Sequence, residues 1–276
     1  MTSRIFCALA VACLCAANLS AQSIRFDTNV GTFDMKLNPT GNPFLQGHVD
    51  NMIAYVDAGR YDVTVINRAA TNFVLQMGGF QAPFLTAPAS FNAFPSVGAF
   101  DRVIVDEDGD GDVDFDLGDL TNNRGSVTLA LASGQPNSGT SSFFVNLMDT
   151  NNFLDAQGFV PFATIDNMET INLIMALPQV NLDPSGNNLA AINVPILEDN
   201  KLVIIERAFV LDATDEMIAS ALANSTLDDL ASIVSDDPPL DDPGGLLIVP
   251  TVPEPSSVLL ASVMATLSLL RRRRAA

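Results

Sequence analysis

The chain has 276 residues, and because 48% of them are hydrophobic the composition excludes a wholly disordered protein. Five of its 13 basic side chains, Arg4 and Arg271 to Arg274, lie in the terminal segments, which leaves 8 against 32 acidic ones in between. Such an excess of negative charge excludes nucleic acid as an expected partner, since the phosphates would be repelled.

The first segment predicts export. Met1 to Ala21 contains one basic residue, Arg4, then an apolar run from Ile5 to Ala17 and a short polar stretch before Gln22. This is the pattern of a secretory signal peptide, and a retained membrane anchor is the alternative. The apolar run is shorter than the ~20 residues that a membrane span needs. All 3 cysteines lie in this segment, so we expect the mature protein to have no disulfide and no thiol chemistry.

Short strands are predicted over most of residues 22–211. Alternating residues in Ile24 to Leu37 indicate a hairpin, and His48 to Ala58 has the spacing of a helix whose exposed start carries the single histidine. Tyr61 to Gln76 predicts two strands, with Arg68 at the end of the first. Further strands are predicted at Gly125 to Leu131, Ser142 to Leu147, Phe159 to Ile165 and Leu202 to Leu211, and a short helix at Met168 to Met175. This order favours a mainly β fold, a closed barrel with helices at its ends.

An acidic insertion occupies residues 106–119. Its oxygen-bearing side chains alternate in the pattern of the first half of an EF-hand calcium loop, with Gly111 at the sixth position. Leu117 stands at the twelfth position, where such loops carry Glu. A calcium site and a solvated acidic loop are the two expectations. The calcium ligands would be Asp106, Asp108, Asp110, Asp112 and Asp114.

The C-terminal part predicts a linker and a sorting segment. Residues 212–251 are acidic and rich in Pro and Gly, with one helical pattern that belongs either to a tether or to a helix docked on the core. Residues 252–276 contain Pro253-Glu254-Pro255, an apolar run and four arginines, which the positive-inside rule keeps in the cytoplasm.

This ending resembles the PEP-CTERM sorting signal of Gram-negative bacteria. The resemblance implies membrane contact through this segment before processing and an exosortase-type processing enzyme as a partner. It also implies a final location on the cell surface or outside the cell. A plain C-terminal membrane anchor is the alternative.

Four tracts, in the right order, resemble the cyclophilins. Arg68 with Asn72 to Gly79 resembles their FHR and GFMIQGG tracts, and Asn123 to Ala130 resembles NTRGTIAMA. Pro136 to Asn146 resembles PNSATSQFFIN, and Asn152 to Asp155 matches NFLD. The likeness runs from about residue 24 to residue 211, across the whole expected domain.

The resemblance implies a closed eight-stranded antiparallel barrel capped by two helices, and a peptidyl-prolyl cis-trans isomerase that needs no cofactor. Its partners would be proline-containing peptides or proteins. Arg68 is implied to stabilise the twisted amide, with Phe73 and Gln76 as the other catalytic residues. The implied substrate-binding residues are Val74, Ala130, Phe144, Phe153, Leu154 and Phe159.

Several positions depart from the usual tracts. Asn67 replaces a His, Val74 replaces a Met, Ser142 replaces a Gln, and Phe159 replaces Tyr or His. We expect an active isomerase whose activity is reduced or whose sequence preference is altered. The alternative is a catalytically weak binding module at the cell surface or in extracellular matrix.

Overall fold

The structure, a computed structural model, describes residues 22–132, 135–186 and 188–211. The predicted signal peptide, the linker with its helix and the sorting segment lie outside these residues. The sheet strands, in chain order, are β1 (Ser23–Thr28), β2 (Thr32–Leu37), β3 (Thr64–Val65), β4 (Arg68–Ala70), β5 (Val74–Met77), β6 (Ser126–Leu129), β7 (Phe143–Asn146), β8 (Pro161–Ile165) and β11 (Ile204–Val210). The remaining regular elements include the helices α1 (Gln46–Asp57) and α2 (Glu169–Met175) and the small hairpin of β9 (Gln179–Val180) and β10 (Val194–Pro195).

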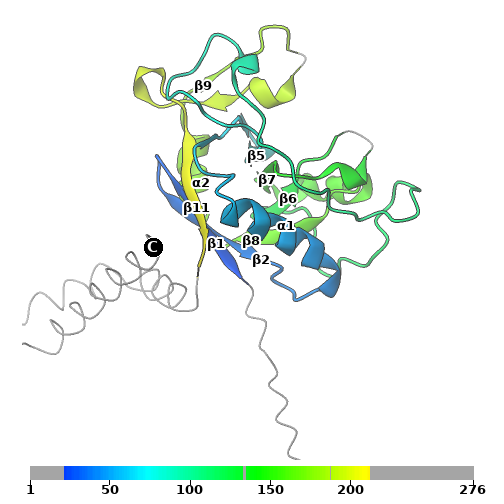
Figure 1. The fold of residues 1–276 in the computed structure, drawn as a ribbon. Helices are drawn as coiled ribbons and strands as arrows, with labels where there is room; N and C mark the ends of the chain where they lie inside the picture. Colours follow the sequence, from blue (N-terminus) through cyan, green and yellow to red (C-terminus); the bar gives the residue numbers. More distant parts are fainter. Residues whose placement is uncertain (1–21, 133–134, 187, 212–276) are drawn as a thin grey trace, which may run out of the picture. The chain divides into compact units, whose positions relative to one another are not determined.

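The fold is mainly β, as the sequence predicts. Nine strands form one curled antiparallel sheet in the order β3-β11-β1-β2-β8-β6-β7-β5-β4 (Figure 1). The β1–β2 hairpin forms where expected, because the Thr28 hydroxyl accepts the amides of Val30 and Gly31 and closes the turn. Phe26 and Phe33 face each other across the two strands, and their rings stack at 5.0 Å.

The sheet differs from the expected closed barrel of eight strands. The stretch predicted as one strand ending at Arg68 is interrupted, so β3 and β4 are separate strands and are the two edges of the sheet. The interruption lies at two neighbouring residues that bond in opposite directions. The amide of Ile66 donates to the Val203 carbonyl, next to β11, whereas the amide of Asn67 donates to the Gln76 carbonyl in β5. Arg68 therefore begins β4 instead of ending the preceding strand.

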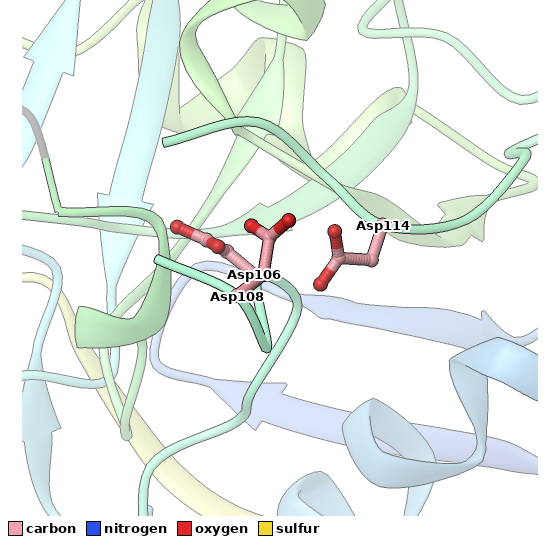
Figure 2. A group of neighbouring side chains, drawn as sticks. All are labelled: Asp106, Asp108 and Asp114. Carbon is pink, nitrogen blue, oxygen red and sulfur yellow. The ribbon is translucent and has the colours of Figure 1, made fainter. Parts of the chain in front are cut away.

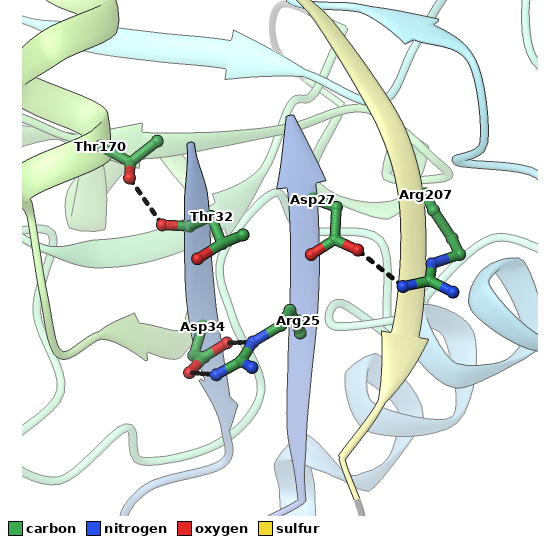
Figure 3. A network of polar contacts seen from close by, with 6 residues as sticks. All are labelled: Arg25, Asp27, Thr32, Asp34, Thr170 and Arg207. Carbon is green, nitrogen blue, oxygen red and sulfur yellow. Dashed lines mark hydrogen bonds and ion pairs between the residues drawn. The ribbon is translucent and has the colours of Figure 1, made fainter. Parts of the chain in front are cut away.

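Two helices pack against the sheet, in agreement with the predicted pair. α1 contacts β11 and buries Met52 and Tyr55, and α2 contacts β2 and buries Ile171 and Ile174. The Thr170 hydroxyl also donates to the Thr32 carbonyl at 2.6 Å, which ties α2 to β2 (Figure 3). Each such buried apolar side chain contributes about 1.5–3 kcal/mol through its removal from water.

Partly exposed ion pairs join β1 to its two neighbours in the sheet, β2 and β11. Arg25 in β1 binds both oxygens of Asp34 in β2 at 2.8 Å, and Arg207 in β11 binds Asp27 in β1 at 2.8 Å (Figure 3). Each pair joins residues that are direct partners across neighbouring strands. Because water screens such pairs, each adds only about 0–1 kcal/mol to stability.

A second apolar cluster was not predicted from the sequence. The stretch 81–100 has no clear period, yet Phe91 and Phe94 in it are buried against Leu182, Val194 and other residues near the β9–β10 hairpin. This lobe, at the top of Figure 1, flanks the strand that carries Arg68, since the Ala69 amide donates to the Asn193 carbonyl at 2.7 Å. Among the described residues, no helix is both long and apolar enough to cross a membrane.

Candidate active site

One row of side chains crosses four neighbouring strands of the sheet. Arg68 in β4 is the direct partner of Gln76 in β5, which is the partner of Phe144 in β7, which faces Thr128 in β6. Direct partners in antiparallel strands point to the same face of a sheet. The sheet itself therefore brings a cation, an amide and an aromatic ring from two distant tracts onto one surface.

Arg68 has no polar partner among the residues that the structure describes. Its guanidinium carbon lies 5.6 Å from the centre of the Phe73 ring, a distance at which cation and ring attract each other. The side chain is half-buried, and burial lowers the pKa of Arg68. Within the described part of the chain its guanidinium makes no hydrogen bond and no ion pair, in contrast to Arg25 with Asp34.

An apolar cluster adjoins the arginine. Val74, Phe144 and Leu154 are buried together, and Ala70, Phe73, Ala130 and Phe159 pack against them. The rings of Phe144 and Phe159 meet edge to face at 5.8 Å. The turn between β4 and β5 brings Phe73 against this cluster. In that turn Asn72 lies in the left-handed region at φ 56°, which asparagine tolerates better than most residues.

Two further predicted residues lie at the edge of this group. The Phe153 ring is 51% exposed and stacks on the Phe73 ring at 6.2 Å. The Gln76 side-chain amide donates to the Ser142 hydroxyl at 3.2 Å, and the Ala130 amide donates to the Ser142 carbonyl at 2.8 Å. All nine catalytic and substrate-binding residues predicted from the sequence thus belong to one connected site.

The acidic insertion is a loop in which three of the five predicted ligands converge. Asp106, Asp108 and Asp114 each offer an oxygen within 4.8 Å of the others, whereas Asp110 and Asp112 fall outside this group (Figure 2). Asp106 is 5% exposed. The amides of residues 109 and 111 donate to its two carboxylate oxygens at 2.6 and 3.0 Å. The loop's own backbone thus satisfies its one buried carboxylate.

His48 is buried, which corrects the expectation of an exposed helix start. Its ring stacks on Phe162 at 5.2 Å, and burial lowers the pKa of His48 to about 4. The histidine lines a small cavity together with Val105, Pro136 and Gly158. Its position is explained by β8, because Phe162 points inward from that strand and the helix α1 covers it.

A set of buried asparagines that bond to the carbonyls of Phe73 and Phe159 was also not predicted from the sequence. Asn122, Asn146 and Asn151 are each 0–2% exposed and bond to one another. The signal was present in the sequence, because Asn146 ends the otherwise apolar strand β7 and a buried amide needs partners.

Comparison with known proteins identifies the family of the chain. Residues 23–198 match the family described as cyclophilin type peptidyl-prolyl cis-trans isomerase/CLD. The chain belongs to this family. It is 28% identical over 183 residues to a peptidyl-prolyl cis-trans isomerase of Acinetobacter baylyi, with 64% of this chain and 85% of the relative covered. It is 31% identical over 164 residues to peptidyl-prolyl cis-trans isomerase B of Escherichia coli, with 55% and 82% covered.

A solved structure is also similar. It is a cyclophilin-type isomerase of Cryptosporidium parvum in the presence of the dipeptide Ala-Pro, at 21% identity and a TM-score of 0.46, covering 69% of this chain and 99% of that one. Membership of the cyclophilin-type isomerases confirms the expected enzyme class and the resemblance found in the four sequence tracts.

Proposed function

We propose that this cyclophilin-type isomerase rotates Xaa-Pro bonds of peptides and proteins at the site centred on Arg68. The proposal is carried by the burial of Arg68 and by the groups around it. Arg68 is a half-buried cation without a polar partner among the described residues, and it borders an apolar pocket that can take a proline ring.

The chemistry suits these groups. Rotation of an amide breaks its resonance against a barrier of about 18–20 kcal/mol. A catalyst must bind the twisted amide more tightly than either planar form. The prolyl nitrogen gains a lone pair that accepts a hydrogen bond only when the amide is twisted, and a guanidinium is a fixed donor that can supply this bond.

The remaining residues hold the substrate. Val74, Phe144 and Leu154 form the buried floor of the proline pocket, and Phe159 closes one side of it. Gln76, which is fixed by Ser142, and the backbone at Ala130 bind the peptide on either side of the proline. None of these steps requires a nucleophile or a cofactor.

An isomerisation assay on the full chain tests this proposal. The substrate is a tetrapeptide with a central Ala-Pro bond, and Arg68→Ala is measured beside the wild type. We expect the wild type to accelerate the reaction and the variant to lose most of the acceleration while it stays folded. Equal rates for both proteins at the level of the uncatalysed reaction would favour the alternative, a cyclophilin-like module that only binds proline peptides.

The terminal segments of the sequence support a separate proposal about the location of the protein. We propose that the protein is exported through its signal peptide and sorted through the Pro253-Glu254-Pro255 segment to the cell surface or the medium. Mass spectrometry of the chain recovered from a Gram-negative host with an exosortase tests this. Recovery of an intact C-terminus from that host would contradict the processing step.

Calcium binding by the acidic insertion stays a prediction of the sequence. It is supported by the approach of the carboxylates of Asp106, Asp108 and Asp114, since like charges at short range repel without a cation. Isothermal titration of the folded chain with CaCl₂ measures it. A heat of binding that Asp114→Asn abolishes is expected, and the absence of any heat would leave a solvated acidic loop.

A further inference from the structure

Three buried asparagines form a continuous chain of hydrogen bonds under the proline pocket. The side-chain amide of Asn151 donates to the Asn146 side-chain oxygen at 2.8 Å, and the Asn146 amide donates to the Asn122 oxygen at 2.9 Å. We call these three residues the amide relay. They come from β7, from the 3-10 helix η4 (Asp149–Gln157) and from the turn before β6, so the relay joins separate parts of the chain.

The two ends of the relay bind the backbone on two sides of the pocket. At one end the Asn151 amide donates to the Phe73 carbonyl at 2.8 Å. At the other end the Asn122 amide donates to the Phe159 carbonyl at 2.8 Å. Phe73 and Phe159 are the residues whose rings border the apolar pocket, so the relay spans from one of its walls to the other.

Every side-chain NH₂ group of the relay has its hydrogen-bond acceptors, which makes the relay rigid. The Asn146 amide also donates to the Ser126 hydroxyl at 3.0 Å, and the Asn122 amide also donates to the Asp155 carboxylate at 2.7 Å. Each of the three amide groups therefore has at least two acceptors. Buried networks whose donors are all used have one arrangement, because any other one would leave a donor unpaired.

Asn146 occupies the centre of this arrangement. It is two residues from Phe144 in β7, so the two side chains point to the same face of the sheet. It is also the direct partner of Val74, the buried pocket residue in β5. A change at Asn146 interrupts the relay in the middle and replaces none of the rings that line the pocket.

We propose that Asn146 is a positioning residue for proline binding, which acts through Asn151 and Asn122 to keep the Phe73 and Phe159 walls of the pocket at a fixed separation. The proposal rests on the proposed function, because it assigns the pocket to the proline ring. Its consequence is specific. Loss of the relay weakens binding of both planar and twisted forms, so KM rises while kcat changes little.

The test measures peptide binding separately from turnover. The chain has no tryptophan, so Phe153→Trp at the rim of the site supplies a single fluorescent reporter of the Ala-Pro tetrapeptide in the full chain. In this background we expect Asn146→Leu, which is close in size but cannot bond, to raise the peptide Kd about 10-fold. In the turnover assay we expect KM to rise similarly and kcat to change less than about 3-fold.

Thr170→Val is the matched control. It also removes a buried side-chain hydrogen bond to a backbone carbonyl, but on α2, away from the pocket. We expect it to lower the melting temperature without changing the peptide Kd. An Asn146→Leu protein that is folded and has a Kd within about twofold of its background would overturn the proposal.

A second variant covers the case in which Asn146→Leu does not fold. Asn151→Ala removes only the end of the relay at Phe73 and is expected to give a similar increase in Kd. If both single variants fold, the double variant should also reach only about a 10-fold increase, because both changes break one connected unit. A product of the two single effects, about 100-fold, would show independent contributions and contradict the relay. If the wild type binds the peptide but is inactive, the proposed isomerase mechanism is wrong. The Kd values would then still test whether Asn146 positions the pocket for peptide binding.

Discussion

The proline pocket and the acidic insertion are both marked by charged residues in the sequence, but the structure holds them in different ways. Arg68 lies at the start of a strand, in register with Gln76 and Phe144, and its surroundings come from several strands. The carboxylates of the insertion lie in a loop, and Asp106 is bound by the amides of its own loop. Several strands together form the pocket, whereas the carboxylate of Asp106 is held by amides of its own loop.

This difference bears on function. Arg68 is half-buried and has no polar partner in the described part of the chain, so its guanidinium retains its hydrogen-bonding capacity for a substrate. A carboxylate whose oxygens already accept backbone amides has spent part of its capacity on the loop itself. We therefore predict large effects from changes in the pocket, on stability where a buried ring is lost and on catalysis where Arg68 is replaced. Changes in the insertion should have small and local effects.

The largest effect is expected from the pocket floor. Phe144→Ala removes a ring that is 5% exposed, and the cavity it leaves lowers the free energy of unfolding by about 3–5 kcal/mol. Phe153→Ala is the control within the same site, and because that ring is 51% exposed it should cost less than about 1 kcal/mol. Urea titrations of both variants measure the difference. Equal losses would mean that the pocket is no better packed than its rim.

The second effect is a loss of stability in acid that comes from His48, which lies between the two sites. The cavity beside His48 is lined by Val105, next to the insertion, and by Gly158, next to Phe159. The pKa of His48 is about 4 in the folded protein, against 6.5 in the unfolded chain. The unfolded state therefore binds the proton first, and the contribution of His48 to stability is complete above pH 6.5 and is lost as the pH falls towards 4.

The expected loss from this histidine is about 3 kcal/mol across that interval. His48→Phe keeps a ring against Phe162 and cannot titrate, so it separates the histidine from the many carboxylates. The unfolding free energy of the wild type should fall more steeply with acid than that of the variant. Parallel pH profiles for the two proteins would show that His48 does not couple protonation to folding.

The third effect concerns catalysis alone. Arg68→Lys keeps the charge but replaces a planar set of donors by a flexible ammonium group, and kcat/KM should fall about 100-fold, or about 2.7 kcal/mol. The melting temperature should stay unchanged because Arg68 has no polar partner to lose among the described residues. Arg207→Lys, at the partly exposed pair with Asp27, is the control and should leave the rate unchanged. A fully active Arg68→Lys enzyme would show that the fixed donor geometry is unnecessary.

The strand and helix pattern could be read from the sequence where local signals and packing agree. The β1–β2 hairpin, both helices and the strands around Val127 and Val145 lie where alternation or helical spacing places them. The break between β3 and β4 could not be predicted, because it depends on Ile66 and Asn67 bonding to strands that are distant in the sequence. The β9–β10 lobe lacks a periodic pattern, and its residues are buried only by tertiary contacts.

The site shows the same limit. Its residues could be listed from four tracts, but the register of the strands could not be predicted, and register is what aligns Arg68 with Gln76 and Phe144. The amide relay was missed because its bonds join residues up to 78 positions apart, from Phe73 to Asn151. His48 was misplaced because a helix start is exposed on average, and only the packing of Phe162 against it reverses that preference.

The smallest effect is expected in the insertion, and it separates backbone support from cation binding. Asp106→Asn leaves one of the two loop amides, at residue 109 or 111, facing an NH₂ group, so the free energy of unfolding should fall by about 1–2 kcal/mol without added calcium. Asp112→Asn, at an exposed carboxylate outside the group of three, should change it by less than about 0.5 kcal/mol. Both measurements are repeated with CaCl₂. If calcium stabilises the wild type and Asp112→Asn but not Asp106→Asn, the buried carboxylate serves the cation as well as the loop. If Asp106→Asn costs nothing in either condition, the loop does not depend on its own hydrogen bonds, and the contrast with the pocket fails.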